Sequence, residues 1–304
     1  MQPGRTGQLF ADLRSGSDGA SRGGLVGYLP VGYPSVEHSL AAFRALTGDG
    51  DSPGVDLVEV GLPYSDPVMD GKTIQKAGTR ALQRGVRTSD VFRAVEAVTA
   101  TGTPAVVMTY WNLVERYGAD AFARDLAAAG GAGMITPDLT PDEAEAWFAA
   151  SDTHGLDRIF LVSPSSTDAR LAATVDACRG WVYATSVMGV TGTRTQASSA
   201  APELVARVRA HDPAALAAVG LGVSNGAQAG AVNVYADAVI VGSALVQPLV
   251  DADEAGRPGD LTALRLVVAD LAAGVRAGAG PTDPNLVSTG SGGTSAGSGG
   301  LSST

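Results

Sequence analysis

The 304-residue chain has little cysteine, few aromatic side chains and an excess of negative charge, and each property excludes a class of protein. Cys178 is the only cysteine, so no intrachain disulfide can form, and its amphipathic surroundings indicate a packing residue. Aromatic residues make up 5% of the chain, which argues against an aromatic-rich β-sandwich. The net charge of −10 argues against a nucleic-acid partner, because phosphate binding requires clustered basic residues.

Long apolar runs and grouped metal ligands are absent from the sequence as well. No run of about 18 residues is free of polar interruption, and the first residues contain no apolar signal segment. We therefore expect a cytoplasmic protein without a membrane span. The three histidines, His38, His154 and His211, lie far apart in the sequence and predict no metal site.

Short apolar runs alternate with amphipathic segments along most of the chain. Eight such runs predict strands, at residues 25–30, 55–60, 104–110, 132–136, 158–162, 181–185, 216–220 and 238–241. Helices are predicted at 7–15, 36–47, 73–83, 89–100, 119–129, 168–178, 202–210, 224–235, 244–250 and 260–277, with Ser35 as one N-cap and Thr140 at a further helix start. Near-equal units of about 30 residues favour a single α/β (β/α)₈ TIM barrel over a doubly wound sheet.

The two ends of the chain have separate expected roles. The helix at residues 7–15 is predicted to cap the N-terminal end of the barrel, which forms one catalytic domain over residues 1–277. Residues 278–304 are rich in Gly, Ser and Thr and cannot bury enough apolar surface to order themselves. We expect a flexible tail that is dispensable for the barrel.

The most informative stretch runs from Val55 to Ile74. Its strand contains one carboxylate, Glu59, close to the carboxyl end, where α/β barrels place their chemistry. A buried carboxylate is unfavourable unless it is paired or functional. The loop that follows contains Asp66 and Asp70. An active site is one interpretation; the other is that Glu59 is a structural ion-pair partner and the aspartates are turn residues.

Three glycine-rich strand exits lie late in the chain, at residues 189–192, 220–222 and 241–243. Glycines allow backbone amides to approach an oxyanion, and a helix N-terminus favours negative charge. Barrel phosphate sites are commonly built from the loops after strands seven and eight. Each glycine alone could be an ordinary turn residue, but three at these positions predict phosphate binding without a basic side chain.

The residues from Glu59 to Pro67, with Asp70-Gly71 and Thr73-Ile74-Gln75, closely resemble the signature of the tryptophan synthase α subunit in its actinobacterial form. The resemblance covers roughly residues 7–275. It implies a lyase that cleaves indole-3-glycerol phosphate to indole and glyceraldehyde 3-phosphate by a retro-aldol reaction in tryptophan biosynthesis. Glu59 would then be the general acid/base that shuttles the proton, and Asp70 the carboxylate that accepts a hydrogen bond from the indole N–H.

The resemblance also implies a set of substrate-binding residues. The indole pocket or reacting centre would be lined by Tyr28, Tyr110, Ile135, Leu161, Tyr183 and Leu221, although apolar members of this set are equally typical of barrel core. The phosphate would be bound by Gly192, Gly222, Gly242 and Ser243, with Thr191 in a mobile flap at residues 186–200. This sequence departs from its relatives at Lys72, where they usually have proline, and at Val187-Met188 in the flap, where some have arginine and serine.

Partners and competing functions complete the expectations. By resemblance, Pro63, Asp66 and Pro67 form a loop tip that contacts a β subunit in an α₂β₂ assembly. That partner contains pyridoxal phosphate, whereas no cofactor is expected in this chain. A stand-alone indole-3-glycerol phosphate lyase and a weakly active barrel that activates a partner remain alternatives. A Schiff-base aldolase is disfavoured, because neither Lys72 nor Lys76 lies in a strand. The scattered histidines disfavour a metal-dependent aldolase.

Overall fold

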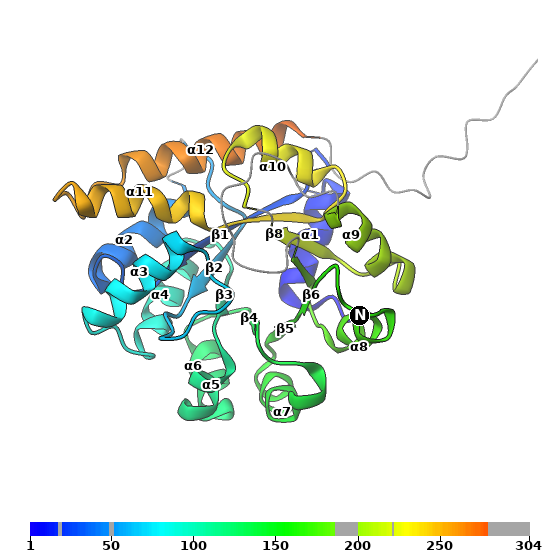
Figure 1. Ribbon diagram of the computed structural model, residues 1–304. Helices are drawn as coiled ribbons and strands as arrows, with labels where there is room; N and C mark the ends of the chain where they lie inside the picture. The colour runs from blue at the N-terminus through cyan, green and yellow to red at the C-terminus, as the bar shows by residue number, and fades with distance from the viewer. Residues whose placement is uncertain (18–19, 49–51, 186–199, 221, 279–304) are drawn as a thin grey trace, which may run out of the picture.

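The computed structural model describes residues 1–17, 20–48, 52–185, 200–220 and 222–278, and its paired strands run parallel. Figure 1 shows the strands gathered around a common axis, with the helices on the outside. The order across the sheet is β5-β4-β3-β2-β1-β9-β8-β7-β6. The strands are β1 (Gly24–Pro30), β2 (Leu57–Gly61), β3 (Ala105–Met108), β4 (Gly133–Ile135), β5 (Asp157–Ile159), β6 (Leu161–Val162), β7 (Val182–Thr185), β8 (Ala217–Gly220) and β9 (Ala238–Val241).

The helices follow the strands in the alternation that the sequence predicted. They are α1 (Gly4–Ser15), α2 (Val36–Leu46), α3 (Lys72–Gln83), α4 (Asp90–Thr99), α5 (Trp111–Tyr117), α6 (Ala119–Ala128), α7 (Glu145–His154), α8 (Asp168–Ala177), α9 (Ala200–His211), α10 (Gly226–Asn233), α11 (Ser243–Glu254) and α12 (Thr262–Ala277), with a 3₁₀ turn, η1 (Pro141–Glu143), before α7. Among the described residues, no helix is both long and apolar enough to cross a membrane.

The predicted fifth strand is divided in two, and this division closes the barrel. β5 pairs with β4, whereas β6 pairs with β7. Between them, the carbonyl of Phe160 accepts a hydrogen bond from the amide of Tyr183 at 3.0 Å. The chain therefore exchanges one neighbouring strand for the other at Phe160. The prediction of a parallel (β/α)₈ barrel is confirmed, with one of its eight strands interrupted.

Some helix starts agree with the sequence-based prediction, and others do not. The Ser35 hydroxyl accepts a hydrogen bond from the His38 amide, as expected of an N-cap. The helix start predicted at Thr140 is present, with Pro141 in the first position, although the Thr140 side chain contacts the Glu143 carboxylate at 3.4 Å rather than capping an amide. A 3₁₀ turn forms there, and α7 begins only at Glu145. Helix α5 was not predicted at all.

The side chains of β2 show how the barrel separates its inside from its outside. Val58 and Val60 belong to the core between the strands and the surrounding helices. Leu57 belongs to the cluster inside the barrel, with Val26, Val106, Ile135, Ile159, Ala218 and Ile240. Because side chains alternate along a strand, Glu59 and Gly61 share the inner face with Leu57. The carboxylate therefore points into the barrel near the carboxyl ends of its strands.

Helix α1 closes the opposite end, as predicted, and begins three residues earlier than expected. Phe10 and Leu13 pack with the interior cluster, and the Phe10 ring lies 5.7 Å from that of Trp181. The buried carboxylate of Asp157 accepts hydrogen bonds from the amides of Arg5 and Thr6 and from the Thr6 hydroxyl, at 3.2, 2.7 and 2.7 Å. This carboxylate fixes the start of α1 beneath the barrel.

Replacing Asp157 by alanine should destabilise the protein by about 2–4 kcal/mol, because buried donors on Thr6 would lose their acceptor. Urea unfolding measures the change. Asp152→Ala is the matched control: its carboxylate is exposed and pairs with Arg158 and Arg179, so its loss should cost roughly 0–1 kcal/mol. Equal effects of the two substitutions would contradict this account of α1.

Candidate active site

Glu59 is the buried carboxyl around which the site is built. Its side chain lies at the exit of β2, the residue is 1% exposed, and its Oε2 atom has no hydrogen-bond partner. Burial, and secondarily the charge of Asp70, raises the pKa of Glu59 from 4.5 to about 8. No ion pair of Glu59 occurs among the described residues, so the structural ion-pair interpretation has no support there. A neutral carboxyl near pH 7 is suited to donating a proton.

Asp70 provides a second carboxyl in a different environment. It lies in the loop between β2 and α3 and is partly buried, and burial raises its pKa from 3.8 to about 6. Asp70 therefore ionises at a lower pH than Glu59. Its charge also raises the pKa of Tyr28 and Tyr183, in each case after the larger effect of burial. Two carboxyls and two tyrosines thus share one end of the barrel.

Two glycines make room for these tyrosines. A Cβ atom on Gly61 would lie 2.4 Å from the Tyr28 hydroxyl oxygen, and one on Gly220 would lie 2.7 Å from that of Tyr183. Both contacts are closer than any side chain tolerates, so each ring crosses the end of a neighbouring strand where only glycine fits. A role for Gly61 in making room for Tyr28 was not predicted from the sequence. Its place two residues after an inward carboxylate is the signal that could have revealed one.

Tyr28 also connects the carboxyls to the predicted phosphate end. It lies opposite Glu59 in the pairing of β1 with β2. A Cβ atom on Gly242 would lie 3.4 Å from the Tyr28 ring and 3.3 Å from the Ile74 side chain. The structure therefore brings together Glu59 of β2, Tyr28 of β1 and Gly242, which follows β9.

The other predicted pocket residues differ in how close they lie to this centre. Ile135 is fully buried in the interior cluster, and Leu161 packs against it. Met108, which the sequence analysis did not select, is paired with Ile135 in register and also packs against the cluster. The hydroxyl of Tyr110 accepts a hydrogen bond from the Met69 amide at 3.0 Å, so this side chain holds the loop that leads to Asp70.

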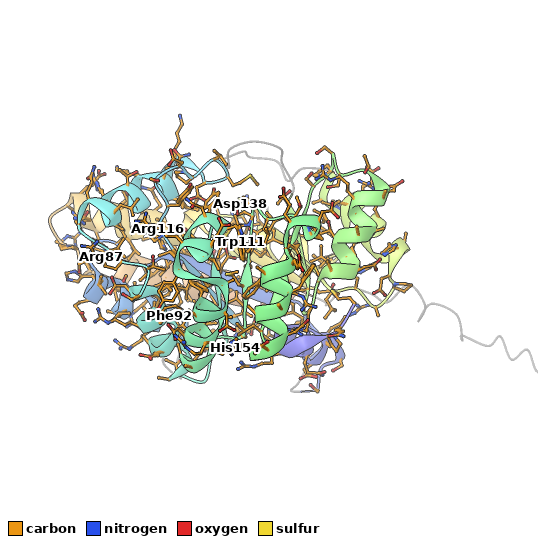
Figure 2. All side chains as sticks on the ribbon, turned by 90° about the horizontal axis from the view of Figure 1, so that it is seen from below. Arg87, Phe92, Trp111, Arg116, Asp138 and His154 are labelled. Atoms are coloured by element: carbon orange, nitrogen blue, oxygen red, sulfur yellow. The ribbon has the colours of Figure 1, made fainter. Side chains whose placement is uncertain are left out.

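Trp111 and Asp138 explain the start of the unpredicted helix α5. The Trp111 amide donates to both carboxylate oxygens of Asp138, at 2.9 and 3.2 Å (Figure 2). Asp138 follows β4, whereas α5 follows β3, so a residue from the loop after one strand anchors the helix after the neighbouring strand. This contact supports the rim of the site on the side of Tyr110.

At the phosphate end, the start of α11 is open to an anion. No side chain caps this helix, and the described residues contain no acceptor for the amides of Ser243 and Ala244. The start of α10 is occupied instead: its amides donate to Gln228 Oε1, Asp270 Oδ2 and Asn225 Oδ1. Free amides at a helix N-terminus bind phosphate well, so α11 is the better candidate.

Gly222 has a φ of +67°, a left-handed conformation that favours glycine. Thr191, Gly192 and Leu221, together with Val187 and Met188, lie outside the described residues.

The predicted loop tip is partly exposed. Asp66 is exposed and Pro67 partly so, but Pro63 is buried, with its ring facing Gly78 of α3. The most exposed apolar residues of the loop are Val68, at 74%, and Met69, at 41%. Neither residue was predicted from the sequence to lie at the loop tip.

Within the described ranges, no group of three or more histidine, cysteine, aspartate or glutamate side chains could bind a metal ion. His154, at the end of α7 (Figure 2), contacts only one carboxylate there, that of Asp120 at 2.9 Å.

Comparison with known proteins finds tryptophan synthase alpha chains that match this chain over nearly the whole barrel. The family model described as "Tryptophan synthase alpha chain" matches residues 15–274. The tryptophan synthase alpha chain of Salinispora tropica is 61% identical over 272 residues, which cover 90% of this chain and 98% of the relative. That of Mycobacterium tuberculosis is 57% identical over 274 residues, covering 90% and 95%.

Solved structures agree with these sequences. A structure of Mycobacterium tuberculosis tryptophan synthase matches with a TM-score of 0.81 and 56% identity, over 90% of this chain and 99% of that one. A mutant tryptophan synthase α subunit from Pyrococcus furiosus matches with a TM-score of 0.72 and 30% identity, over 82% and 98%. The chain therefore belongs to the tryptophan synthase alpha chain family, lyases that cleave indole-3-glycerol phosphate in tryptophan biosynthesis.

Proposed function

We propose that this lyase uses Glu59 as its general acid/base and Asp70 as the carboxylate that accepts a hydrogen bond from the indole N–H. The observation that supports the proposal is the pair of carboxyls whose environments separate their pKa values, about 8 for Glu59 and about 6 for Asp70. Near neutral pH, Glu59 retains its proton while Asp70 is largely ionised. Such a pair can donate a proton and stabilise positive charge in one step.

The reaction then needs no other acid or base from the chain. Neutral Glu59 protonates C3 of the indole ring, and the positive charge that develops on the ring nitrogen is stabilised by ionised Asp70. The bond between C3 and the glycerol carbon breaks and returns its electron pair to the ring. The glycerol hydroxyl gives its proton to the Glu59 carboxylate as the aldehyde forms. Glu59 ends protonated, ready for the next cycle.

The substrate would lie across the barrel mouth between these carboxyls and α11. Tyr28, Tyr183, Ile135 and Leu161 would surround the reacting end, with Met108 as an additional apolar contact. The amides at Gly242 and Ser243 would hold the phosphate, with Gly222 beside them. We retain Thr191, Gly192 and Leu221 as proposed contacts by family resemblance, and Tyr110 as a support of the catalytic loop.

Glu59→Gln should reduce indole formation by roughly 10²–10⁴-fold, because the amide cannot exchange the proton. The same variant should be more stable than wild type above pH 4.5. Since the pKa of Glu59 is raised from 4.5 to about 8, the folded protein holds a proton that the unfolded chain releases in this window. Wild-type stability therefore falls as pH rises, by at most about 1.4 kcal/mol per unit, and glutamine removes this loss.

Indole release and urea unfolding at pH 5 and pH 8 measure the two effects. A folded variant with wild-type turnover would refute the catalytic role. If the stability difference between Glu59→Gln and wild type were the same at pH 5 and at pH 8, the raised pKa of Glu59 would be refuted.

Gly242→Val should raise KM for indole-3-glycerol phosphate by about tenfold or more, because the side chain would occupy space between Ile74, Tyr28 and the phosphate. Steady-state kinetics measure the change. Ala255→Val, at the exposed far end of α11, is a control for adding a branched side chain to this helix. A KM that changes equally in both variants would contradict a phosphate site centred on Gly242.

The remaining proposals concern the assembly. We propose one catalytic domain over residues 1–277, a separate tail at 278–304, and a cytoplasmic location. We further propose an α₂β₂ complex with a β subunit that contains pyridoxal phosphate. The exposed Val68 and Met69 at the tip of the catalytic loop favour a subunit over a free-standing lyase, since a partner would cover them.

Asp66→Ala should reduce activation by a β subunit from the same source more than it reduces the activity of the isolated chain. The exposed Asp66 carboxylate bonds only to the neighbouring Ser65 hydroxyl within the described part of the loop, so basal activity has little reason to fall. Indole release with and without the β subunit gives both numbers. Full activity in the isolated chain, without association on a sizing column, would favour the free-standing lyase.

A further inference from the structure

The loop that carries Asp70 is bonded at its end to the side-chain amide of Gln75, which has no part in the proposed chemistry. Gln75, in the first turn of α3, donates from Nε2 to the carbonyl of Asp70 at 2.9 Å and to that of Pro67 at 3.3 Å. A side-chain amide has two N–H donors, and here both have an acceptor in the same loop. Gln75 therefore ties the first and last parts of the 67–70 segment to the start of α3.

The other tethers of Asp70 are few. Within the described ranges no donor reaches its carboxylate, and its own amide makes a long contact of 3.4 Å with the Pro67 carbonyl. Met69 is bonded through its amide to Tyr110, but the side chains of Val68 and Met69 are largely exposed and pack little. The position of the Asp70 carboxylate is thus set through its backbone, and Gln75 makes the shortest of the contacts to that backbone.

The contact of Gln75 with the loop matters more in this chain because residue 72 is lysine rather than proline. A proline at the first helical position would fix the entry into α3, because its φ is preset and its missing N–H has no helical acceptor in any case. This chain has Lys72 there, so the loop lacks that restraint. Gly71, with φ −73° and ψ 161°, already has the extended conformation that a residue before proline requires.

We propose that Gln75 is a positioning residue that holds the Asp70 carboxylate at the distance from Glu59 that the cleavage requires. The inference rests on the proposed role of Asp70. Among the described residues, the Gln75 side chain donates hydrogen bonds only to backbone carbonyls, so it acts through Asp70 and leaves substrate binding at α11 to other groups. Its loss should lower kcat and leave KM unchanged, because a misplaced catalytic group slows the chemical step.

Gln75→Met tests the proposal, since methionine preserves the length of the side chain and removes both donors. We expect kcat for indole release to fall about 10–100-fold and KM for indole-3-glycerol phosphate to stay within about twofold. Gln75→Glu, which has acceptors only, should act in the same direction. Gln247→Met on α11 is the matched control: Gln247 is exposed, accepts from Thr73 and contacts no loop carbonyl, so its kcat should be unchanged.

Two further variants separate positioning from a merely structural effect. In an Asp70→Asn background, Gln75→Met should lower kcat by less than about threefold, because residues that act as a unit are not additive. Adding Lys72→Pro to Gln75→Met should recover part of the lost kcat by restraining the same loop.

An unchanged kcat in Gln75→Met and Gln75→Glu would overturn the positioning role. An equal loss of kcat on adding Gln75→Met to wild type and to Asp70→Asn would overturn it as well. Wild-type turnover in Asp70→Asn alone would instead overturn the role of Asp70.

Discussion

The burial of one unpaired carboxyl is the constraint on which the rest of the site depends. Glu59 shares the inner face of β2 with Leu57, and its Oε2 atom has no partner. Such an arrangement is unfavourable for an ion, so the proton stays on the side chain near neutral pH. In the proposed mechanism, the same burial that is unfavourable for a charged Glu59 keeps it protonated and able to act as the acid. The neighbouring Val58 and Val60 are buried in the core between the strands and the helices.

In the proposed function, the other features of the barrel mouth hold a second carboxyl and a phosphate around Glu59. Gly61 allows Tyr28 to cross between β1 and β2, and Tyr28 in turn reaches Gly242 at the start of α11. The loop to Asp70 is restrained from both sides, by Tyr110 and by Gln75. At the opposite end, α1 and its buried anchor Asp157 complete the interior without taking part in the chemistry.

The sequence predicted what depends on local order and missed what depends on distant contacts. Short apolar runs located the strands, and a single carboxylate near the carboxyl end of one of them, Glu59, predicted where the active site lies. The fifth strand is divided at Phe160 because its first part pairs with β4 and its second part with β7. The start of α5 depends on Asp138, which lies in the loop after β4. Pro63 looked like a loop tip but is buried against α3. Gln75 lies within the family signature, but nothing local in the sequence shows that its side chain bonds to the carbonyls of Asp70 and Pro67.

The central claim is that Glu59 is a neutral acid near pH 7 whose proton affinity depends on burial and on the charge of Asp70. Infrared difference spectroscopy of the carboxylic acid C=O band measures this directly, with Glu59→Gln used to assign the band. The account predicts a band that disappears near pH 8 in wild type and at a lower pH in Asp70→Asn. A Glu59 carboxyl that titrates near 4.5, or one that Asp70→Asn leaves unmoved, would contradict it.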